Sequence, residues 1–261
     1  MPPPASRIRH ERSAKRVRAY LGGHVVVDTD RPLLVWEISR YPAYYLPSAD
    51  VVARLEPTGE NSLLRTGDHA DGYDVAVGDR RAAASARIPV TPATAALADH
   101  VRFTWSAMDA WFEEDEEVFV HPRDPYKRID ALRSTRRFMV ELDGEVVADT
   151  HAAVVLHETG LIPRHYLAPT DVRRDLLEHS ETVTHCPYKG TARYYHLYLG
   201  DQRFDDIAWE YPTPLPESAP IAGRICFDDL RVDVSIDGRR RPRPTSPSAV
   251  DLVGELAPHG G

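Results

Sequence analysis

The stretch RVRAYLGGHVVVDT, residues 16–29, recurs 121 positions later as RFMVELDGEVVADT, residues 137–150. The match continues without a gap as far as Val51 and Val172, with thirteen identical residues in a window of 36. Two β-rich runs on either side of a glycine turn are typical of a β-hairpin. Self-similarity over this length indicates an internal duplication, so we expect two copies of one β-rich unit.

The repeat also sets the expected organisation of the chain. We predict a mainly β protein with a minor helical part, built as two tandem small barrel-like or tent-like β units. One short helix per unit is predicted at residues 47–55 and 169–177, where a hydroxyl N-cap and an acid precede apolar residues. The expected divisions are a disordered N-terminus, a first and degenerate β unit, a connecting segment, a second β unit and a flexible tail, at residues 1–14, 15–104, 105–135, 136–238 and 239–261.

The composition is that of an ordinary globular protein. The chain has 261 residues, of which 42% are hydrophobic and 28% charged, and its formal net charge is −8. An acidic balance disfavours a general affinity for nucleic acid or anionic membranes. No apolar run approaches the roughly 20 residues that span a bilayer. We therefore expect a cytoplasmic protein whose partner is a small molecule, with neither nucleic acid nor a membrane as a partner.

Reactive side chains are concentrated in THCPYKGTA, residues 184–192, within the second copy. Cys186 is a candidate nucleophile if Lys189 or His185 lowers the pKa of its thiol. Lys189 is suited to binding a carboxylate or phosphate. The first copy has neither the cysteine nor the lysine, which predicts that the second unit carries the site. A small buried cysteine in an ordinary turn would explain the same residues, and both interpretations stay open.

Further candidates lie around this motif. Glu158 and Tyr166 recur in the first copy as Glu37 and Tyr45, and we assign Glu158 as an acid or base and Tyr166 as an orienting group. With Cys186 and Lys189 they form the candidate catalytic set. The candidate ligand-binding residues are His185, Tyr188, Tyr195, Trp209 and Arg123. Because the chain shows neither a phosphate-binding glycine loop nor a metal-ligand spacing, we expect no metal and no large cofactor.

Several motifs, in order, resemble the bacterial family known as domain of unknown function 427. They include the paired openings, CPYKGTA at residues 186–192 and IAWEYP at residues 207–212, while HPRDPY at residues 121–126 is similar to the linker of tandem members. The resemblance covers roughly residues 15–238 and implies a compact, mostly β fold. Some classifications attach a nucleotidyltransferase label to this family.

Together these features predict binding of a small polar or anionic metabolite in the second unit. Whether the ligand is also transformed stays open at this level. A non-catalytic scaffold or partner-binding module is one alternative, supported by the acidic run at residues 113–117 and the Arg- and Pro-rich tail. A metal-dependent nucleotidyltransferase is the other, and it would need converging carboxylates.

Overall fold

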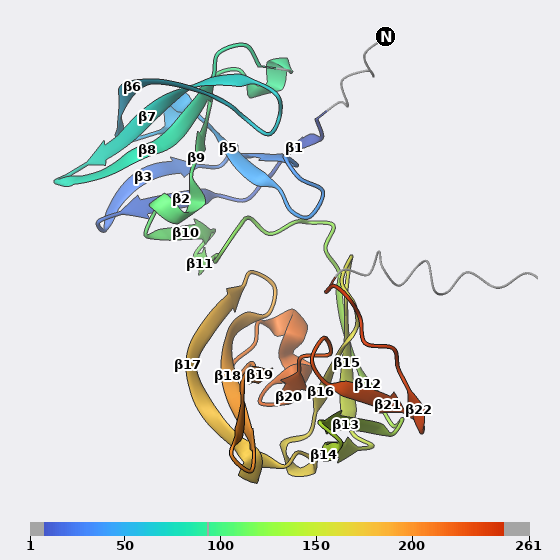
Figure 1. Ribbon diagram of the computed structural model, residues 1–261. Coiled ribbons are helices and arrows are strands. Elements are labelled where there is room, and N and C mark those ends of the chain that lie inside the picture. Colours follow the sequence, from blue (N-terminus) through green and yellow to red (C-terminus); the bar gives the residue numbers. More distant parts are fainter. Residues whose placement is uncertain (1–7, 93, 248–261) are drawn as a thin grey trace, which may run out of the picture. The chain divides into compact units, whose positions relative to one another are not determined.

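The computed structural model describes residues 8–92 and 94–247, and the chain divides into unit 1 (Met1–Pro125) and unit 2 (Tyr126–Gly261) (Figure 1). Each unit contains a seven-stranded and a four-stranded sheet. All the pairings between their strands are antiparallel. In neither unit do the described strands close into a barrel.

Unit 1 has sheet orders β1-β4-β5-β9-β8-β7-β6 and β11-β10-β2-β3. Its strands are β1 (His10–Arg12), β2 (Val17–Leu21), β3 (His24–Thr29), β4 (Leu33–Val35), β5 (Ala43–Pro47), β6 (Arg54–Leu63), β7 (His69–Val77), β8 (Arg80–Pro89), β9 (His100–Phe103), β10 (Ala110–Glu113) and β11 (Glu116–Glu117). Its helical segments are the 3-10 turns η1 (Ser48–Asp50), η2 (Ala95–Leu97) and η3 (Trp105–Ala107).

Unit 2 has sheet orders β12-β15-β16-β20-β19-β18-β17 and β14-β13-β21-β22. Its strands are β12 (Ile129–Ser134), β13 (Phe138–Leu142), β14 (Glu145–Thr150), β15 (Ala153–Glu158), β16 (Arg164–Leu167), β17 (Leu177–Cys186), β18 (Gly190–Leu199), β19 (Gln202–Glu210), β20 (Ile225–Phe227), β21 (Asp233–Ile236) and β22 (Arg239–Arg240). Its helical segments are the 3-10 turns η4 (Pro169–Asp171), η5 (Arg174–Leu176) and η6 (Pro216–Ile221).

The two units have the same topology, strand for strand. The seven-stranded orders coincide when β1 is matched with β12, and the four-stranded orders coincide when β2 is matched with β13. A register shift on β2 between Ala19 and Tyr20 recurs at the matching place on β13, between Val140 and Glu141. The fold therefore confirms the predicted tandem arrangement of two mainly β units related by duplication.

The quoted repeat forms a hairpin in each unit, as predicted. The β2–β3 turn holds Gly22 and Gly23 at φ 62° and 78°, and the β13–β14 turn holds Asp143 and Gly144 at φ 49° and 86°. Two successive positive φ values belong to the tight turn whose twist matches that of antiparallel strands, and glycine and aspartate tolerate them best. The sequence thus forms this hairpin through local backbone preferences.

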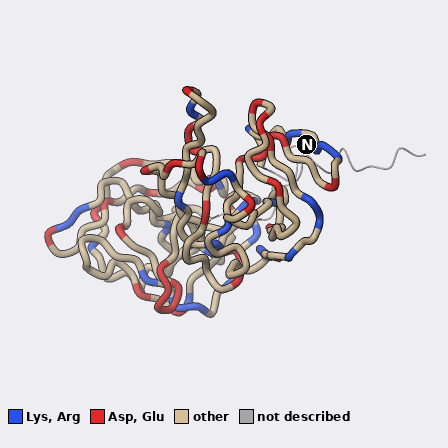
Figure 2. The backbone as a smooth tube through the Cα atoms, turned by 90° about the horizontal axis from the view of Figure 1, so that it is seen from below, with Lys and Arg blue, Asp and Glu red and all other residues tan. Residues whose placement is uncertain are grey.

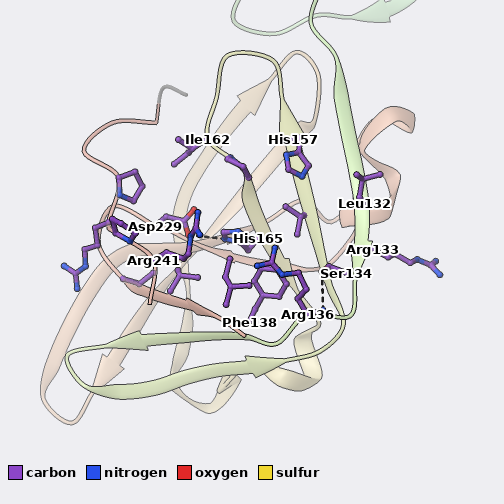
Figure 3. Close-up of a pocket in the computed structure, with 18 residues that line it drawn as sticks. Leu132, Arg133, Ser134, Arg136, Phe138, His157, Ile162, His165, Asp229 and Arg241 are labelled. Carbon is purple, nitrogen blue, oxygen red and sulfur yellow. Dashed lines mark hydrogen bonds and ion pairs between the residues drawn. The ribbon is translucent and has the colours of Figure 1, made fainter. Parts of the chain in front are cut away.

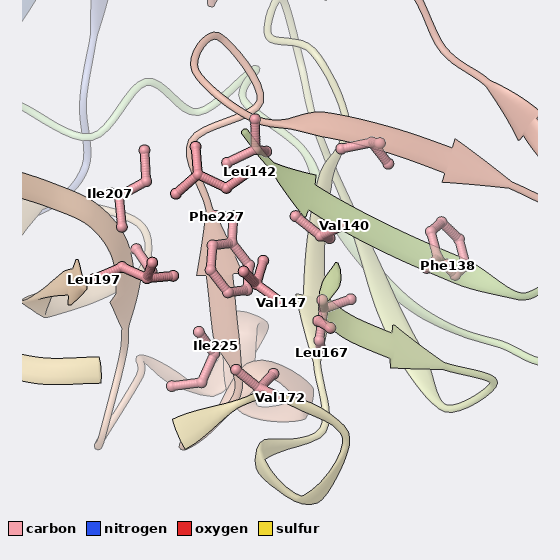
Figure 4. Close-up of a cluster of buried hydrophobic side chains, with 14 of the residues drawn as sticks. Phe138, Val140, Leu142, Val147, Leu167, Val172, Leu197, Ile207, Ile225 and Phe227 are labelled. Carbon is pink, nitrogen blue, oxygen red and sulfur yellow. The ribbon is translucent and has the colours of Figure 1, made fainter. Parts of the chain in front are cut away.

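The main core of each unit lies between its two sheets. In unit 2, Phe138, Val140 and Leu142 of the small sheet pack against Leu197 and Ile207 of the large sheet and their neighbours (Figure 4). The opposite face of the large sheet carries a second cluster, which includes Val154, Leu156, Tyr166, Ala192, Tyr211, Ile221 and Cys226. Because both faces are buried, alternate residues of β15 and β16 point into different environments.

Three segments of the structure differ from the divisions expected from the sequence. Residues 10–12, assigned to the disordered N-terminus, form β1 and pair with β4. Residues 105–135, assigned to a connecting segment, supply β10 and β11 to unit 1 and β12 to unit 2. Residues 239–247, assigned to the flexible tail, begin with β22 and fold back so that the Ile162 N–H donates to the Pro247 carbonyl at 3.1 Å. The expected disorder of residues 1–7 and 248–261 lies outside the described residues.

The helical segments are shorter than expected from the sequence. In place of helices over residues 47–55 and 169–177, the chain makes 3-10 turns and then returns to extended backbone, with Val51 and Val172 bridging to Val27 and Ala148. β-branched residues at these points favour the extended state over a continued helix.

Candidate functional site

The predicted catalytic residues lie around the tip of the β17–β18 hairpin. Cys186 is opposite Gly190 in the ladder, and Gly190 adopts φ 97°, a value that suits glycine in a tight turn. Between them, Lys189 reaches back to the end of β15 and forms an ion pair with Glu158. The side chains of Lys189 and Glu158 are only 12% and 7% exposed. The structure therefore brings together three of the four residues of the predicted catalytic set.

The charges of this cluster compensate one another. Burial alone would lower the pKa of Lys189, but the neighbouring Cys186 and Glu158 outweigh that effect and raise the pKa above its ordinary value. Lys189 is consequently a cation already bound to a carboxylate. That arrangement stabilises the hairpin tip, and it leaves Lys189 less available to an anionic ligand than the sequence suggested.

Tyr166 lies in the interior of the same sheet face. Its side chain is buried, and the Trp209 indole N–H donates to its hydroxyl at 3.4 Å. Burial raises the pKa of Tyr166 well above its ordinary value, so the hydroxyl keeps its proton near neutral pH. Cys186 packs beside this buried cluster. Tyr166 is thus a core residue, and the half-buried Trp209 packs against the same cluster.

The other predicted ligand-binding residues lie at several places in the two units. His185 is exposed on the outer side of β17 and contacts the Thr191 hydroxyl at 3.0 Å. Tyr188 is buried at the hairpin tip, and Tyr195 belongs to the core between the two sheets. Arg123 lies in unit 1, where its backbone N–H donates to Glu113 at 3.1 Å.

The corresponding carboxylate of unit 1 is also paired with a cation, but that cation comes from a different strand. Glu37, the counterpart of Glu158, is held by Arg102 at 2.6 Å and accepts a hydrogen bond from the Tyr45 hydroxyl at 2.9 Å. By strand register, Arg102 on β9 occupies the place of Cys226 on β20. The lysine of the second copy therefore supplies the charge that an arginine supplies in the first.

A pocket of about 420 Å³ lies in unit 2, at the opposite face of β15 and β16 (Figure 3). Both sheets and the segment that follows β22 contribute to it, so it occupies the open edge between the two sheets. We call it the unit 2 pocket. Its lining residues are Leu132, Arg133, Ser134, Arg136, Phe138, Val155, His157, Ile162, Pro163, His165, Asp229, Val232, Val234, Ile236, Arg241, Pro242, Arg243 and Pro244.

The unit 2 pocket combines apolar walls with a basic rim. Four arginines line it, against the single carboxylate of Asp229. Arg136 and Arg243 are paired with carboxylates outside the lining. Arg133 and Arg241 are exposed and form no ion pair within the described part of the chain, but the Arg133 side chain points away from the pocket, because Arg133 lies opposite Val154 of the other sheet face (Figure 3). Basic and acidic residues are interspersed along the backbone (Figure 2), so the excess of arginines is a local property of this pocket.

His165 lies at the base of the pocket beside Asp229 (Figure 3). Its ring packs on Phe138 at a centroid distance of 5.1 Å. Its Nδ1 is buried, has no hydrogen-bond partner in the described part of the chain and lies 3.7 Å from Asp229 Oδ1. Arg164 holds the same carboxylate at 3.3 Å. A polar atom that is buried without a partner in this way is uncommon in folded proteins.

Unit 1 has a smaller pocket at the corresponding place, with a volume of about 190 Å³. Aromatic side chains occupy positions that are open in unit 2: Tyr44 replaces His165, Trp105 replaces Asp229 and Trp111 replaces Val234. Trp105 and Trp111 stack at 4.7 Å. The larger unit 2 pocket therefore follows from smaller side chains on the same backbone.

Sequence reasoning missed the unit 2 pocket. The signal that could have found it lies in the repeat itself, because aligning the copies places a histidine, His165, over an aromatic residue, Tyr44. The remaining contributors, Arg241 to Pro244, lie beyond the end of the recognisable repeat. Their composition is typical of a solvated tail.

Two searches of the described residues gave no candidate. No group of three or more His, Cys, Asp or Glu side chains is placed to hold a metal ion in the described ranges. Within the same ranges, no helix is both long and apolar enough to cross a membrane.

Comparison with known proteins agrees with the duplicated fold. No curated protein matches the chain. A family model described as domain of unknown function (DUF427) matches twice, at residues 9–114 and 130–238, and these ranges coincide with the sheets of unit 1 and unit 2. The chain therefore belongs to the DUF427 family, in a form that carries two copies of the domain in tandem.

Proposed function

We propose that this protein binds a small organic anion in unit 2, and that the unit 2 pocket is the binding site. The observation that carries the proposal is the pocket's size and chemistry. A volume of about 420 Å³ is within the range of small-molecule sites. Apolar walls can hold a hydrocarbon body, while the exposed Arg241 at the rim can bind a carboxylate or phosphate.

The contrast with unit 1 supports this assignment. The same backbone positions in unit 1 carry the stacked pair Trp105 and Trp111, which fill much of the corresponding space. In this fold the space at the open edge between the sheets can thus be filled by the protein's own side chains, as it is in unit 1. In this proposal the Lys189–Glu158 pair is a stabilising contact of the hairpin tip, and anion binding is assigned to Arg241, which lies beside Val234 of the pocket lining.

Matched acids and amides test the proposal. Phenylacetate and 3-phenylpropanoate, together with their uncharged amides, would be titrated into the full chain by calorimetry. We expect each acid to bind about tenfold more tightly than its amide, because one charge-assisted contact contributes roughly 1.5 kcal/mol. Equal affinities of acid and amide would contradict the proposal.

Variants at the rim locate the binding. Changing Arg241→Gln should remove the preference for the acid. Arg239→Gln is the matched control, because Arg239 is exposed on β22, two residues from Arg241, and does not line the pocket. An acid preference that survives in Arg241→Gln would place the anion elsewhere.

A further inference from the structure

The two ring nitrogens of His165 have different surroundings. Nδ1 is buried and faces Asp229, whereas Nε2 remains accessible on a residue that lines the unit 2 pocket. A carboxylate beside one imidazole nitrogen favours the tautomer that carries its proton on that nitrogen. In the neutral ring, Nε2 is then a hydrogen-bond acceptor directed at whatever occupies the pocket.

The register explains why this acceptor has no partner among the described residues of unit 2. At the matching place in unit 1, the Tyr44 hydroxyl donates to the buried Glu113 at 2.6 Å. The counterpart of Glu113 in unit 2 is Ile236, which is apolar and itself lines the pocket. The second copy has therefore lost the internal polar partner and gained an accessible nitrogen at the same point.

We propose that the ligand of the unit 2 pocket is a hydroxylated apolar acid whose hydroxyl donates to His165 Nε2, an inference that rests on the anion binding proposed above. The arginine rim selects the acid group, and the walls formed by Phe138 and Ile162 contact the apolar body. The donor is an uncharged hydroxyl, because an ammonium group would be repelled by the Arg241 guanidinium at the pocket rim.

The test uses acids that differ only at the end far from the carboxylate. Phenylacetate, 4-fluorophenylacetate and 4-hydroxyphenylacetate, with the corresponding 3-phenylpropanoates, would be titrated into the full chain. Fluorine resembles a hydroxyl in size but cannot donate. We expect the hydroxylated member of one or both series to bind about tenfold more tightly than its fluoro analogue, as a hydrogen bond of roughly 1.4 kcal/mol predicts.

Two variants test whether His165 accepts the hydrogen bond from the ligand hydroxyl. His165→Phe keeps a ring of similar volume and should abolish the preference for hydroxyl over fluorine while retaining the preference for acid over amide. His157→Phe is the control, since His157 also lines the pocket, and it should leave the hydroxyl preference intact.

The outcomes separate the two proposals. Acids that bind with equal affinity whether they carry hydroxyl or fluorine would overturn the hydroxyl inference and leave anion binding standing, and this result needs no variant. Acids that bind no better than their amides would overturn anion binding, and with it the hydroxyl inference. A hydroxyl preference that persists in His165→Phe would also overturn the assignment of His165.

Discussion

Unit 1 and unit 2 have the same strands in the same order, yet they satisfy their buried polar groups differently. In unit 1, Glu37 is bound by Arg102 and Tyr45, and Tyr44 donates to Glu113, so these groups are all paired within the unit. In unit 2, Glu158 is bound by the hairpin lysine, while Nδ1 of the histidine that replaces Tyr44 has no hydrogen-bond partner.

This difference teaches which features the fold requires and which it does not. Both copies keep a buried carboxylate at the end of the second strand of the large sheet, and both provide it with a cation, though from different strands. The requirement is therefore a compensated charge and not a particular residue. Because aromatic packing at the open edge occurs in one copy only, the fold does not require it, and that edge was free to change.

The largest expected effect comes from breaking the pair in unit 2. Lys189→Met should destabilise unit 2 by about 3 kcal/mol, because it leaves the Glu158 carboxylate buried without a cation. Adding Glu158→Gln should restore most of the loss, since both charges are then removed. Urea unfolding followed through hydrogen exchange of unit 2 amides would measure the changes. If the double variant lost as much stability as the sum of the two single variants, the energetic coupling of Lys189 and Glu158 would be contradicted.

The same experiment in unit 1 sharpens the comparison. Arg102→Met should lower the stability of its unit less than Lys189→Met does, because the Tyr45 hydroxyl still donates to Glu37.

The pH dependence of the stability of unit 2 also follows from the Lys189–Glu158 pair. Since the pKa of Lys189 in the folded state is above its ordinary 10.5, the stabilisation is complete at neutral pH and is lost only as the pH rises beyond that value. Loss of the pair's contribution between pH 7 and 9 would contradict this account.

The repeat made the fold predictable, because its signals are local. The turn at Gly22 and Gly23 and the alternation around it specify a hairpin whatever lies elsewhere. For Tyr194 and Tyr195, the alternation of side chains along a strand predicts that the two rings lie on opposite faces of the sheet. Only the register reveals that Tyr194 joins the cluster beside Cys186 while Tyr195 enters the other core.

The site was not predictable in the same way. The Lys189–Glu158 contact joins residues 31 positions apart and depends on how the β17–β18 hairpin curves over β15. The unit 2 pocket depends on the segment from Arg241 to Pro244 packing against the sheets, and that composition favours a disordered tail when only local sequence is considered. Tertiary packing decides both.

A further prediction compares the two residues at the base of the pockets, Tyr44 and His165. Tyr44→Phe should destabilise unit 1 by about 1.5–2 kcal/mol, because it removes a hydrogen bond to the buried Glu113 carboxylate. His165→Phe should change the stability of unit 2 by no more than about 0.5 kcal/mol, because Nδ1 has no hydrogen bond to lose. Thermal and urea unfolding of the two variants would measure both values. Equal losses would show that His165 has an internal partner after all.

The smallest expected effect concerns the segment that forms one wall of the unit 2 pocket. Asp233 binds both Arg240 and Arg243, and these arginines lower the pKa of its carboxyl to about 2. Because that pKa is below the ordinary 3.8, the contribution is present above pH 3.8 and is lost as the pH falls towards 2. Asp233→Asn should remove it at any pH, at a cost of less than about 1 kcal/mol, since the arginines are largely exposed.

Local exchange is the sensitive measurement for this contact. The Arg241 N–H donates to the Val234 carbonyl at 2.7 Å, so its exchange rate reports whether the wall segment is attached to β21. In Asp233→Asn that amide should exchange several-fold faster, while the Leu142 amide within the adjacent hairpin should be unchanged. Binding of phenylacetate should slow exchange at Arg241 in the wild type, because an anion at the rim favours the attached segment. Unit 1 amides should not respond, since the counterpart of Arg241, Val118, has no charge to offer the ligand. If neither Asp233→Asn nor phenylacetate changed exchange at the Arg241 amide, the wall segment would be held by its proline-rich backbone alone.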